Sequence, residues 1–272
     1  MPVDVSGNTP SFVSRDSVFS TVLGLLEQAR TDAGNADLSL TQQRILGSGF
    51  SLPNTIDAML ARYHLFSGNY QEAITAADRV DPSVLSVLSY SGTTQNPIWN
   101  LSFELSYVKV LDSWAQAAES GDARVSYWAD PDSSFAGNPP DSLLIEPVRY
   151  ASAGATFPVY LPDEMKLIRA EAYTMTDQFG LARQEIDAVR TQSSSSLDEP
   201  VADLPSIPDD ELDTEQELLA QIAYERRYEL YNQGLRWEDT RRLGTAITTT
   251  PTADFLPTPS QECDNNPNAT GC

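Results

Sequence analysis

Two segments of this sequence, separated by a short turn, have the residue spacing of a helical hairpin. Residues 54–66 and 70–80 place apolar side chains three and four positions apart, with Gly68 and Asn69 between them. Counted from Asn54 in a frame of about 34 residues, the places that tetratricopeptide repeats fill with leucine, tyrosine or a small residue hold Leu60, Ala61, Tyr70, Ala73 and Val80. Small residues on both helices let antiparallel helices pack closely, so this spacing predicts a helical hairpin.

The same spacing recurs in the second half of the chain. Residues 162–175 and 181–192 are predicted to form helices joined by a turn over 176–180, and the matching places hold Ala170, Tyr173 and Ala182. An amphipathic helix is also expected over residues 15–30. The recurrence favours a mainly α fold of tetratricopeptide-like helical hairpins.

The stretch between the hairpins differs in composition. Residues 83–160 are rich in proline, glycine, asparagine and serine, with a short strand expected over 98–103 and a short helix or strand over 105–114. We expect a single domain that covers the whole chain and has four parts: helical repeats over about 15–82 and about 161–244, a loop-rich insertion over about 83–160, and an extended tail over 245–272.

Two further helices are predicted near the end of the second repeat region. Thr214 and Glu217 have the spacing of a capping box, so a strong helix is expected to begin there. Gly234 is expected to end that helix as its C′ residue. A short helix over residues 236–242 follows.

Composition excludes several classes of protein. The chain has 39 Asp and Glu against 17 Lys and Arg, a net charge of −22, so its surface repels nucleic-acid phosphates and anionic lipid headgroups. One histidine and two cysteines exclude multi-histidine and cysteine-rich metal sites. Apolar runs stay short of the roughly 18 residues that span a bilayer. We expect no cofactor, metal or nucleic-acid partner.

The cations are almost all arginines, since Lys109 and Lys166 are the only lysines. Strong carboxylate repulsion with few ammonium groups is tolerated best in high salt, where screening is strong. Two interpretations stay open: a salt-loving source, or ordinary acidic solubility combined with a codon preference for arginine.

The two ends of the chain also leave alternatives open. Residues 1–8 have no basic region, apolar region or lipidation cysteine, so the chain is either cytoplasmic or an internal part of a longer secreted precursor. Cys263 and Cys272 either close a terminal loop by a disulfide in an oxidising compartment or remain free thiols.

Residues 224–244 carry the most specific motif. They resemble the ERR-x-EL-x-x-EG-x-RW-x-DL-x-R-x-G signature of the SusD/RagB family, through Glu225, Arg226, Arg227, Glu229, Leu230, Gly234, Arg236, Trp237, Asp239, Arg241 and Gly244. Gln233 and Thr240 depart from the pattern. Residues 121–124, 165–173, 186–190, 255–259 and 266–268 are similar to further segments of the family in the same order. The resemblance corresponds to the middle and C-terminal parts of these longer proteins.

This resemblance implies a fold, a function and a location. SusD/RagB proteins are surface lipoproteins of Bacteroidota that capture nutrients and deliver them to a SusC-like TonB-dependent transporter. It therefore implies a non-enzymatic protein that binds an oligosaccharide or peptide, faces outward from the outer membrane, and contacts it only through a lipid anchor missing from this chain. The alternative is a helical-repeat interaction scaffold without a glycan site.

Candidate residues fall into two groups. Aromatic rings in the loop-rich insertion suit a sugar-binding surface, because ring faces stack on pyranose rings, and the ligand candidates are Trp99, Tyr127, Trp128 and Phe135. Charges in the motif recur three and four residues apart and are expected to pair along and between two helices. A structural role is therefore predicted for Glu225, Arg226, Arg227, Glu229, Gly234, Arg236, Trp237, Asp239 and Arg241. No catalytic residue is expected, since His64 lies on a repeat helix among apolar neighbours.

The charge balance yields a test. If the net charge of −22 reflects a salt-loving source, carboxylate repulsion destabilises the fold in dilute buffer and screening relieves it. The thermal midpoint is expected to rise between about 0.1 M and more than 1 M KCl. A flat or falling midpoint would contradict this interpretation.

Overall fold

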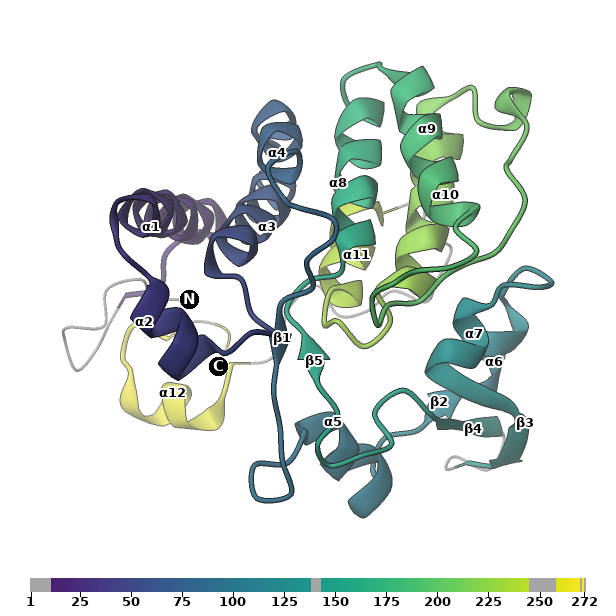
Figure 1. Cartoon of the computed structure of the whole chain (residues 1–272), viewed down its shortest axis with the longest axis horizontal. Coiled ribbons are helices and arrows are strands. Elements are labelled where there is room, and N and C mark those ends of the chain that lie inside the picture. The colour runs from purple at the N-terminus through teal and green to yellow at the C-terminus, as the bar shows by residue number, and fades with distance from the viewer. Residues whose placement is uncertain (1–10, 138–142, 245–257, 270, 272) are drawn as a thin grey trace.

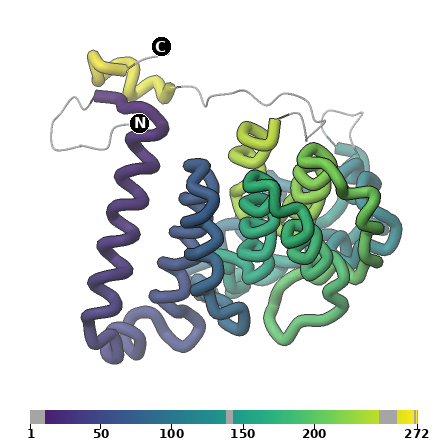
Figure 2. The backbone as a smooth tube through the Cα atoms, turned by 90° about the horizontal axis from the view of Figure 1, so that it is seen from above, coloured from purple at the N-terminus to yellow at the C-terminus, as the bar shows by residue number. Residues whose placement is uncertain are grey.

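The structure, a computed structural model, describes residues 11–137, 143–244, 258–269 and 271. Its longer helices lie side by side (Figures 1 and 2). They are α1 (Arg15–Asn35), α3 (Leu52–Phe66), α4 (Tyr70–Ala77), α8 (Pro162–Thr174), α9 (Phe179–Arg190) and α10 (Glu215–Glu229). α3 packs on α4 and α8 packs on α9, so both predicted hairpins and the mainly α fold are confirmed.

Small residues form the contacts that the repeat spacing predicts. Ala61 on α3 and Ala73 on α4 are fully buried in one core, which α8 completes with Ile168 and Ala172. A second core joins α8, α9 and α10. Because α8 contributes to both cores, the two hairpins form one continuous helical body.

The loop-rich insertion carries short elements of both kinds. β1 (Val87–Leu88) pairs with β5 (Phe157–Pro158), and a three-stranded antiparallel sheet has the order β2-β4-β3. That sheet contains β2 (Val110–Leu111), β3 (Ala129–Ala136) and β4 (Leu143–Pro147), and two short helices lie beside it, α6 (Asp112–Gln116) and α7 (Arg124–Trp128).

The strand expected over residues 98–103 is wrong. α5 (Pro97–Trp99) and the π-helical η2 (Asn100–Glu104) occupy this stretch. Asn96 starts the helical turn, because its side-chain oxygen accepts from the backbone N–H groups of Ile98 and Trp99. This local cap overrides the β propensity of the apolar residues that follow.

The capping box at Thr214 and Glu217 is confirmed, but the predicted end of α10 is wrong. The helix ends at Glu229, and a turn with positive φ at Asn232 and Gly234 leads into α11 (Arg236–Arg242). Gly234 therefore shapes the turn between two helices instead of terminating the first.

The remaining elements are short. They are α2 (Ser39–Thr41), the π-helical η1 (Gln42–Leu46), the 3-10 helix η3 (Asp209–Glu211) and α12 (Ser260–Asn265). The expected extended tail thus contains a helix, while residues 245–257 lie outside the described part. Cys263 is disulfide-bonded, and the sequence contains one other cysteine, Cys272, outside the described residues. Among the described helices, none has the length and hydropathy of a membrane span.

Candidate functional site

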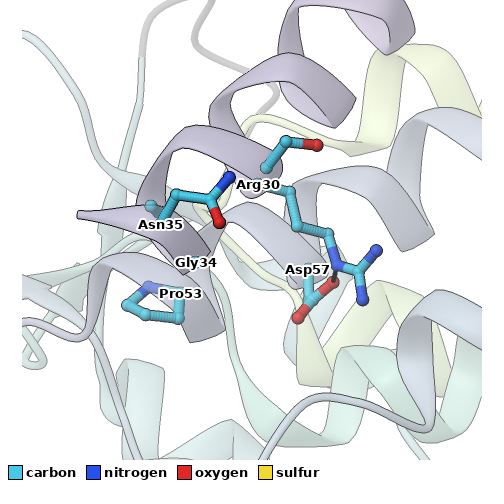
Figure 3. A pocket seen from close by; sticks show the side chains of 7 residues that line it. Arg30, Gly34, Asn35, Pro53 and Asp57 are labelled. Carbon is cyan, nitrogen blue, oxygen red and sulfur yellow. Dashed lines mark ion pairs between the residues drawn. The ribbon is translucent and has the colours of Figure 1, made fainter.

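Two of the described pockets are lined by an arginine that is already paired with carboxylates. In a pocket of about 440 Å³ beside α1 and α3, the Nε atom of Arg30 lies 3.1 Å from Oδ1 of Asp57 (Figure 3). In a pocket of about 520 Å³ beside α9 and α10, Arg190 pairs with Glu119 and Glu225. In neither pocket does the lining arginine lack a carboxylate partner.

A third pocket, of about 640 Å³, lies where α6 meets α10 and α11. We call it the α6/α10/α11 pocket. Its lining combines apolar, aromatic and cationic side chains and contains no carboxylate: Leu111, Ser113, Trp114, Arg226, Arg227, Leu230, Tyr231, Asn232, Gly234, Arg236, Trp237 and Thr240. This mixture is typical of ligand sites, which join an apolar surface to a few orienting polar groups.

Aromatic rings give the pocket its apolar surface. The rings of Trp114 and Tyr231 lie 4.4 Å apart between centroids and are tilted by 38°. Burial raises the pKa of Tyr231 to about 12, so its hydroxyl stays protonated at physiological pH. Trp237 lines the pocket from α11 and is half-buried. These rings suit an apolar face of a ligand.

Arginines give the pocket its charge. The Nε atom of Arg226 lies 2.9 Å from Oδ2 of Asp239, but both Nη atoms of Arg226 are buried without a hydrogen-bond partner. Arg227 and Arg236 pair with no carboxylate in the described part of the chain. Arg227 lies over the ring of Tyr228, and Arg236 donates to a backbone carbonyl. The pKa of Arg236 is lowered by burial and then by the charge of Arg227.

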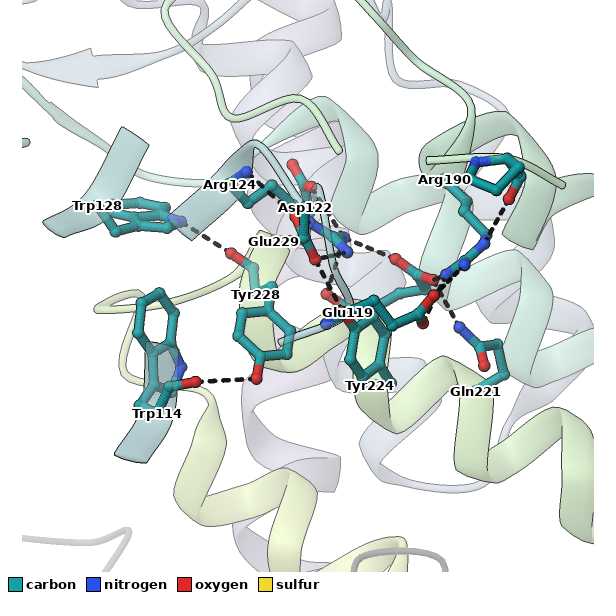
Figure 4. A network of polar contacts seen from close by, with 12 residues as sticks. Trp114, Glu119, Asp122, Arg124, Trp128, Arg190, Gln221, Tyr224, Tyr228 and Glu229 are labelled. Atoms are coloured by element: carbon teal, nitrogen blue, oxygen red, sulfur yellow. Dashed lines mark hydrogen bonds and ion pairs between the residues drawn. The ribbon is translucent and has the colours of Figure 1, made fainter. Parts of the chain in front are cut away.

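A buried polar network behind the pocket fastens the loop-rich insertion to α10 (Figure 4). Arg124 on α7 makes two hydrogen bonds to Asp122, at 2.9 and 2.8 Å, and its Nη1 lies 2.6 Å from Oε2 of Glu225. The other carboxylate oxygen of Glu225 accepts from Arg190 at 3.1 Å and from Gln221 at 2.7 Å. Glu225 is thus the shared anion of two arginines that come from different parts of the chain.

Tyrosines on the same face of α10 extend this network. Tyr224 donates to Asp122 at 2.9 Å, and Tyr228 donates to the backbone carbonyl of Trp114 at 3.0 Å. The indole N–H of Trp128 in turn donates to the carbonyl of Tyr228 at 2.8 Å. Trp114 is therefore positioned in the pocket by contacts that originate on α10.

Glu229 is the least satisfied member of the network. It is fully buried, its nearest cation is Arg124 at 3.6 Å, and neither of its carboxylate oxygens has a hydrogen-bond partner. Burial, reinforced by the negative charge of Asp163, raises the pKa of Glu229 well above its ordinary value.

The four ligand candidates from the sequence do not form one surface. Trp128 is 1% exposed and packs among core rings, so this ring, predicted as a ligand candidate, has no face open to a ligand. Tyr127 meets Trp128 edge to face at 89° and donates its hydroxyl to Asp198. Trp99 on α5 and Phe135 on β3 are half-buried, and neither is a lining residue of the α6/α10/α11 pocket.

Some residues of the motif are buried between helices, and others line the α6/α10/α11 pocket. Glu225, Arg226, Glu229 and Asp239 are buried, and the pair of Arg226 with Asp239 joins α10 to α11 as expected. Other motif residues for which only a structural role was expected line the pocket: Arg227, Gly234, Arg236 and Trp237. The sequence reasoning missed Trp114 and Tyr231, although Tyr231 stands inside the motif.

In the described part of the chain, no three His, Cys, Asp or Glu side chains are grouped as ligands for a metal ion. The polar side chains that line the α6/α10/α11 pocket are arginine, serine, threonine and asparagine, which offer hydrogen bonds to a ligand beside the aromatic rings.

Comparison with solved structures shows where this architecture occurs. A SusD superfamily protein from Bacteroides vulgatus matches with a TM-score of 0.63 and 14% identity, over 99% of this chain and 72% of that protein. A SusD-like carbohydrate-binding protein from Bacteroides fragilis matches with a TM-score of 0.62 and 14% identity, over 90% of this chain and 63% of that protein. A SusD superfamily protein from Bacteroides thetaiotaomicron matches with a TM-score of 0.59 and 15% identity, over 88% of this chain and 61% of that protein.

The chain is thus a helical-repeat protein with a loop-rich insertion, and its fold is SusD-like, as the motif over residues 224–244 predicts. It spans less than two thirds of the length of two of these three proteins. No protein-family model and no curated protein matches the sequence. At identities of 14–15%, the comparison establishes the fold alone.

The network predicts different outcomes for its two buried carboxylates. Glu225→Gln removes the anion that Arg124 and Arg190 share, while Asp122 and Glu119 still pair with them, so a loss of about 1–3 kcal/mol in the free energy of unfolding is expected. Chemical denaturation at neutral pH measures it. Glu229→Gln is the control, and because Gln resembles the protonated acid, its loss is expected to be much smaller. Equal losses for the two variants would contradict the assignment.

Glu229 also predicts a pH dependence. Its folded pKa is raised, so the folded state binds this proton more tightly than the unfolded state. The stabilisation is present below the unfolded pKa and is lost as pH rises through the folded pKa. The stability of the wild type relative to Glu229→Gln is therefore expected to fall as pH rises above about 4.5. Thermal melts of both proteins across pH 4–8 measure this change. A wild type that becomes more stable relative to Glu229→Gln as pH rises would overturn the prediction.

Trp128 is expected to contribute to stability. Trp128→Ala removes a fully buried ring and leaves a cavity, at a cost of about 3–5 kcal/mol. Trp99→Ala removes a half-buried ring and is expected to cost less. Thermal melts of the two variants compare them, and an unchanged melt for Trp128→Ala contradicts its place in the core.

Proposed function

We propose that this protein binds carbohydrate without catalysing a reaction, and that the α6/α10/α11 pocket is its ligand site. The observation that carries the proposal is the combination of the half-buried rings of Tyr231 and Trp237, the first packed on the buried Trp114, with unpaired arginines in one pocket. Flat rings accept the C–H face of a sugar, and guanidinium and amide groups donate to its oxygens. The SusD-like carbohydrate-binding protein from Bacteroides fragilis, which has the same fold, supports this choice of ligand class.

The proposal extends to location and partner. A protein of this kind captures an oligosaccharide at the outer membrane, where a lipid anchor holds it, and passes the ligand to a SusC-like TonB-dependent transporter. Large apolar side chains exposed along the insertion offer a surface for such a partner: Leu101, Leu105, Tyr107, Val108 and Leu111. The same exposed side chains favour the alternative function, an interaction scaffold without a glycan site.

Binding of a glycan separates the two functions. Trp237→Leu keeps apolar volume but removes the flat ring, and it is expected to weaken oligosaccharide binding by about 1–3 kcal/mol. Calorimetry against a panel of oligosaccharides, with a thermal melt of each variant, measures the effect.

Trp99→Leu is the matched control, because Trp99 is also half-buried but lies outside the pocket. Its affinity is expected to equal that of the wild type. If no oligosaccharide binds the wild type, the glycan function is overturned and the scaffold function is supported. If both variants lose affinity equally, the site is elsewhere.

A further inference from the structure

We propose that the α6/α10/α11 pocket recognises a carboxylate, so that the ligand is an oligosaccharide with an isolated acidic sugar such as a uronic acid. This inference rests on the proposed function and names the substrate class of the same pocket. It follows from the charges that line the pocket, the unused hydrogen-bond donors there, and the charge of the whole chain.

Unpaired arginines are unusual in this molecule. With 39 carboxylates for 17 cations, an arginine readily finds an anion. Among the described residues, three arginines form no ion pair: Arg44, Arg227 and Arg236. Arg44 is exposed to solvent, whereas Arg227 and Arg236 are half-buried and line the same pocket. A half-buried cation without an anion is costly, and a bound carboxylate removes that cost.

The side-chain atoms of the pocket residues that are buried without a hydrogen-bond partner are all donors. Both Nη atoms of Arg226 and the indole N–H of Trp114 are donors without a partner, but these atoms are buried beneath the pocket surface. Arg227 and Arg236 add guanidinium donors that are more exposed. Since none of the lining residues is a carboxylate, the pocket complements an acceptor with negative charge.

The charge of the whole chain limits how acidic the ligand is. A net charge of −22 repels a polyanion such as an oligouronate or a nucleic acid along its whole length. One carboxylate on an otherwise neutral oligosaccharide meets the pocket arginines and carries little charge elsewhere. The half-buried rings of Tyr231 and Trp237 accept the neutral sugars beside it.

The test compares neutral oligosaccharides with the same oligosaccharides carrying one uronate. The probes are xylo-, manno- and gluco-oligosaccharides, each neutral, with one glucuronate, and with that glucuronate as its methyl ester. The full chain is expected to bind an acidic form about 10- to 100-fold more tightly than its methyl ester. This is the gain in affinity expected from a hydrogen bond between two charged groups. Calorimetry gives the affinities.

The variants assign the preference to the pocket. Arg227→Gln and Arg236→Gln are each expected to reduce affinity for the acidic form about ten-fold or more and to reduce affinity for the methyl ester much less, so that the preference for the acid shrinks. Binding of the ester by each variant also shows that it is folded. Arg44→Gln is the matched control, an unpaired arginine outside the pocket, and is expected to bind like the wild type.

Failure of this inference can be told apart from failure of the proposed function. If acid and ester bind equally, or only neutral forms bind, carboxylate recognition is overturned while carbohydrate binding stands. If Arg44→Gln loses as much affinity as the pocket variants, the preference comes from the overall charge and the inference is overturned. If no probe binds the wild type, both proposals are overturned.

Discussion

The buried contact between Arg124 and Glu225 holds the two parts of this molecule together. Arg124 belongs to the loop-rich insertion and Glu225 to the helical body, and their side chains are fully buried. A guanidinium in such a place requires an anion, because an uncompensated buried charge costs far more than an exposed one. Arg190 shares the same carboxylate, so α9, α10 and α7 are fixed to one another at a single point. The α6/α10/α11 pocket lies beside this point, so the contacts that fix the insertion to α10 also fix the relative positions of the pocket residues on α6 and α10.

Local patterns predicted the local structure well. The hairpins, the capping box at Thr214 and the short helix α11 all follow from spacings of three and four residues, because one helical turn determines them. The end of α10 did not follow from its glycine. Asn232 adopts a positive φ two residues earlier, and a sequence does not reveal which of two suitable residues makes the turn.

The candidate site needed information that local spacing does not contain. The carboxylate of Glu225 meets Arg124 across 101 residues of chain, and the buried Trp128 donates its indole N–H to the backbone carbonyl of Tyr228, 100 residues away. The three- and four-residue spacing of the motif charges also led to one predicted role, a structural one, for all of its residues. In the structure its residues point in different directions, so Glu225 enters the interior while Arg227 reaches the pocket. Neighbouring residues on a helix lie about 100° apart, and one motif serves both purposes.

The same carboxylates that make the surface repulsive also make the pocket selective. At physiological ionic strength the screening length is about 8 Å, so surface charges farther away than this act weakly on a small ligand inside the pocket. Arg227 and Arg236 are half-buried and adjacent to the ligand, so their attraction is screened much less. A long polyanion extends beyond the pocket and meets the acidic surface, whereas one carboxylate does not. Surface and pocket together therefore favour a ligand whose charge is confined to one sugar.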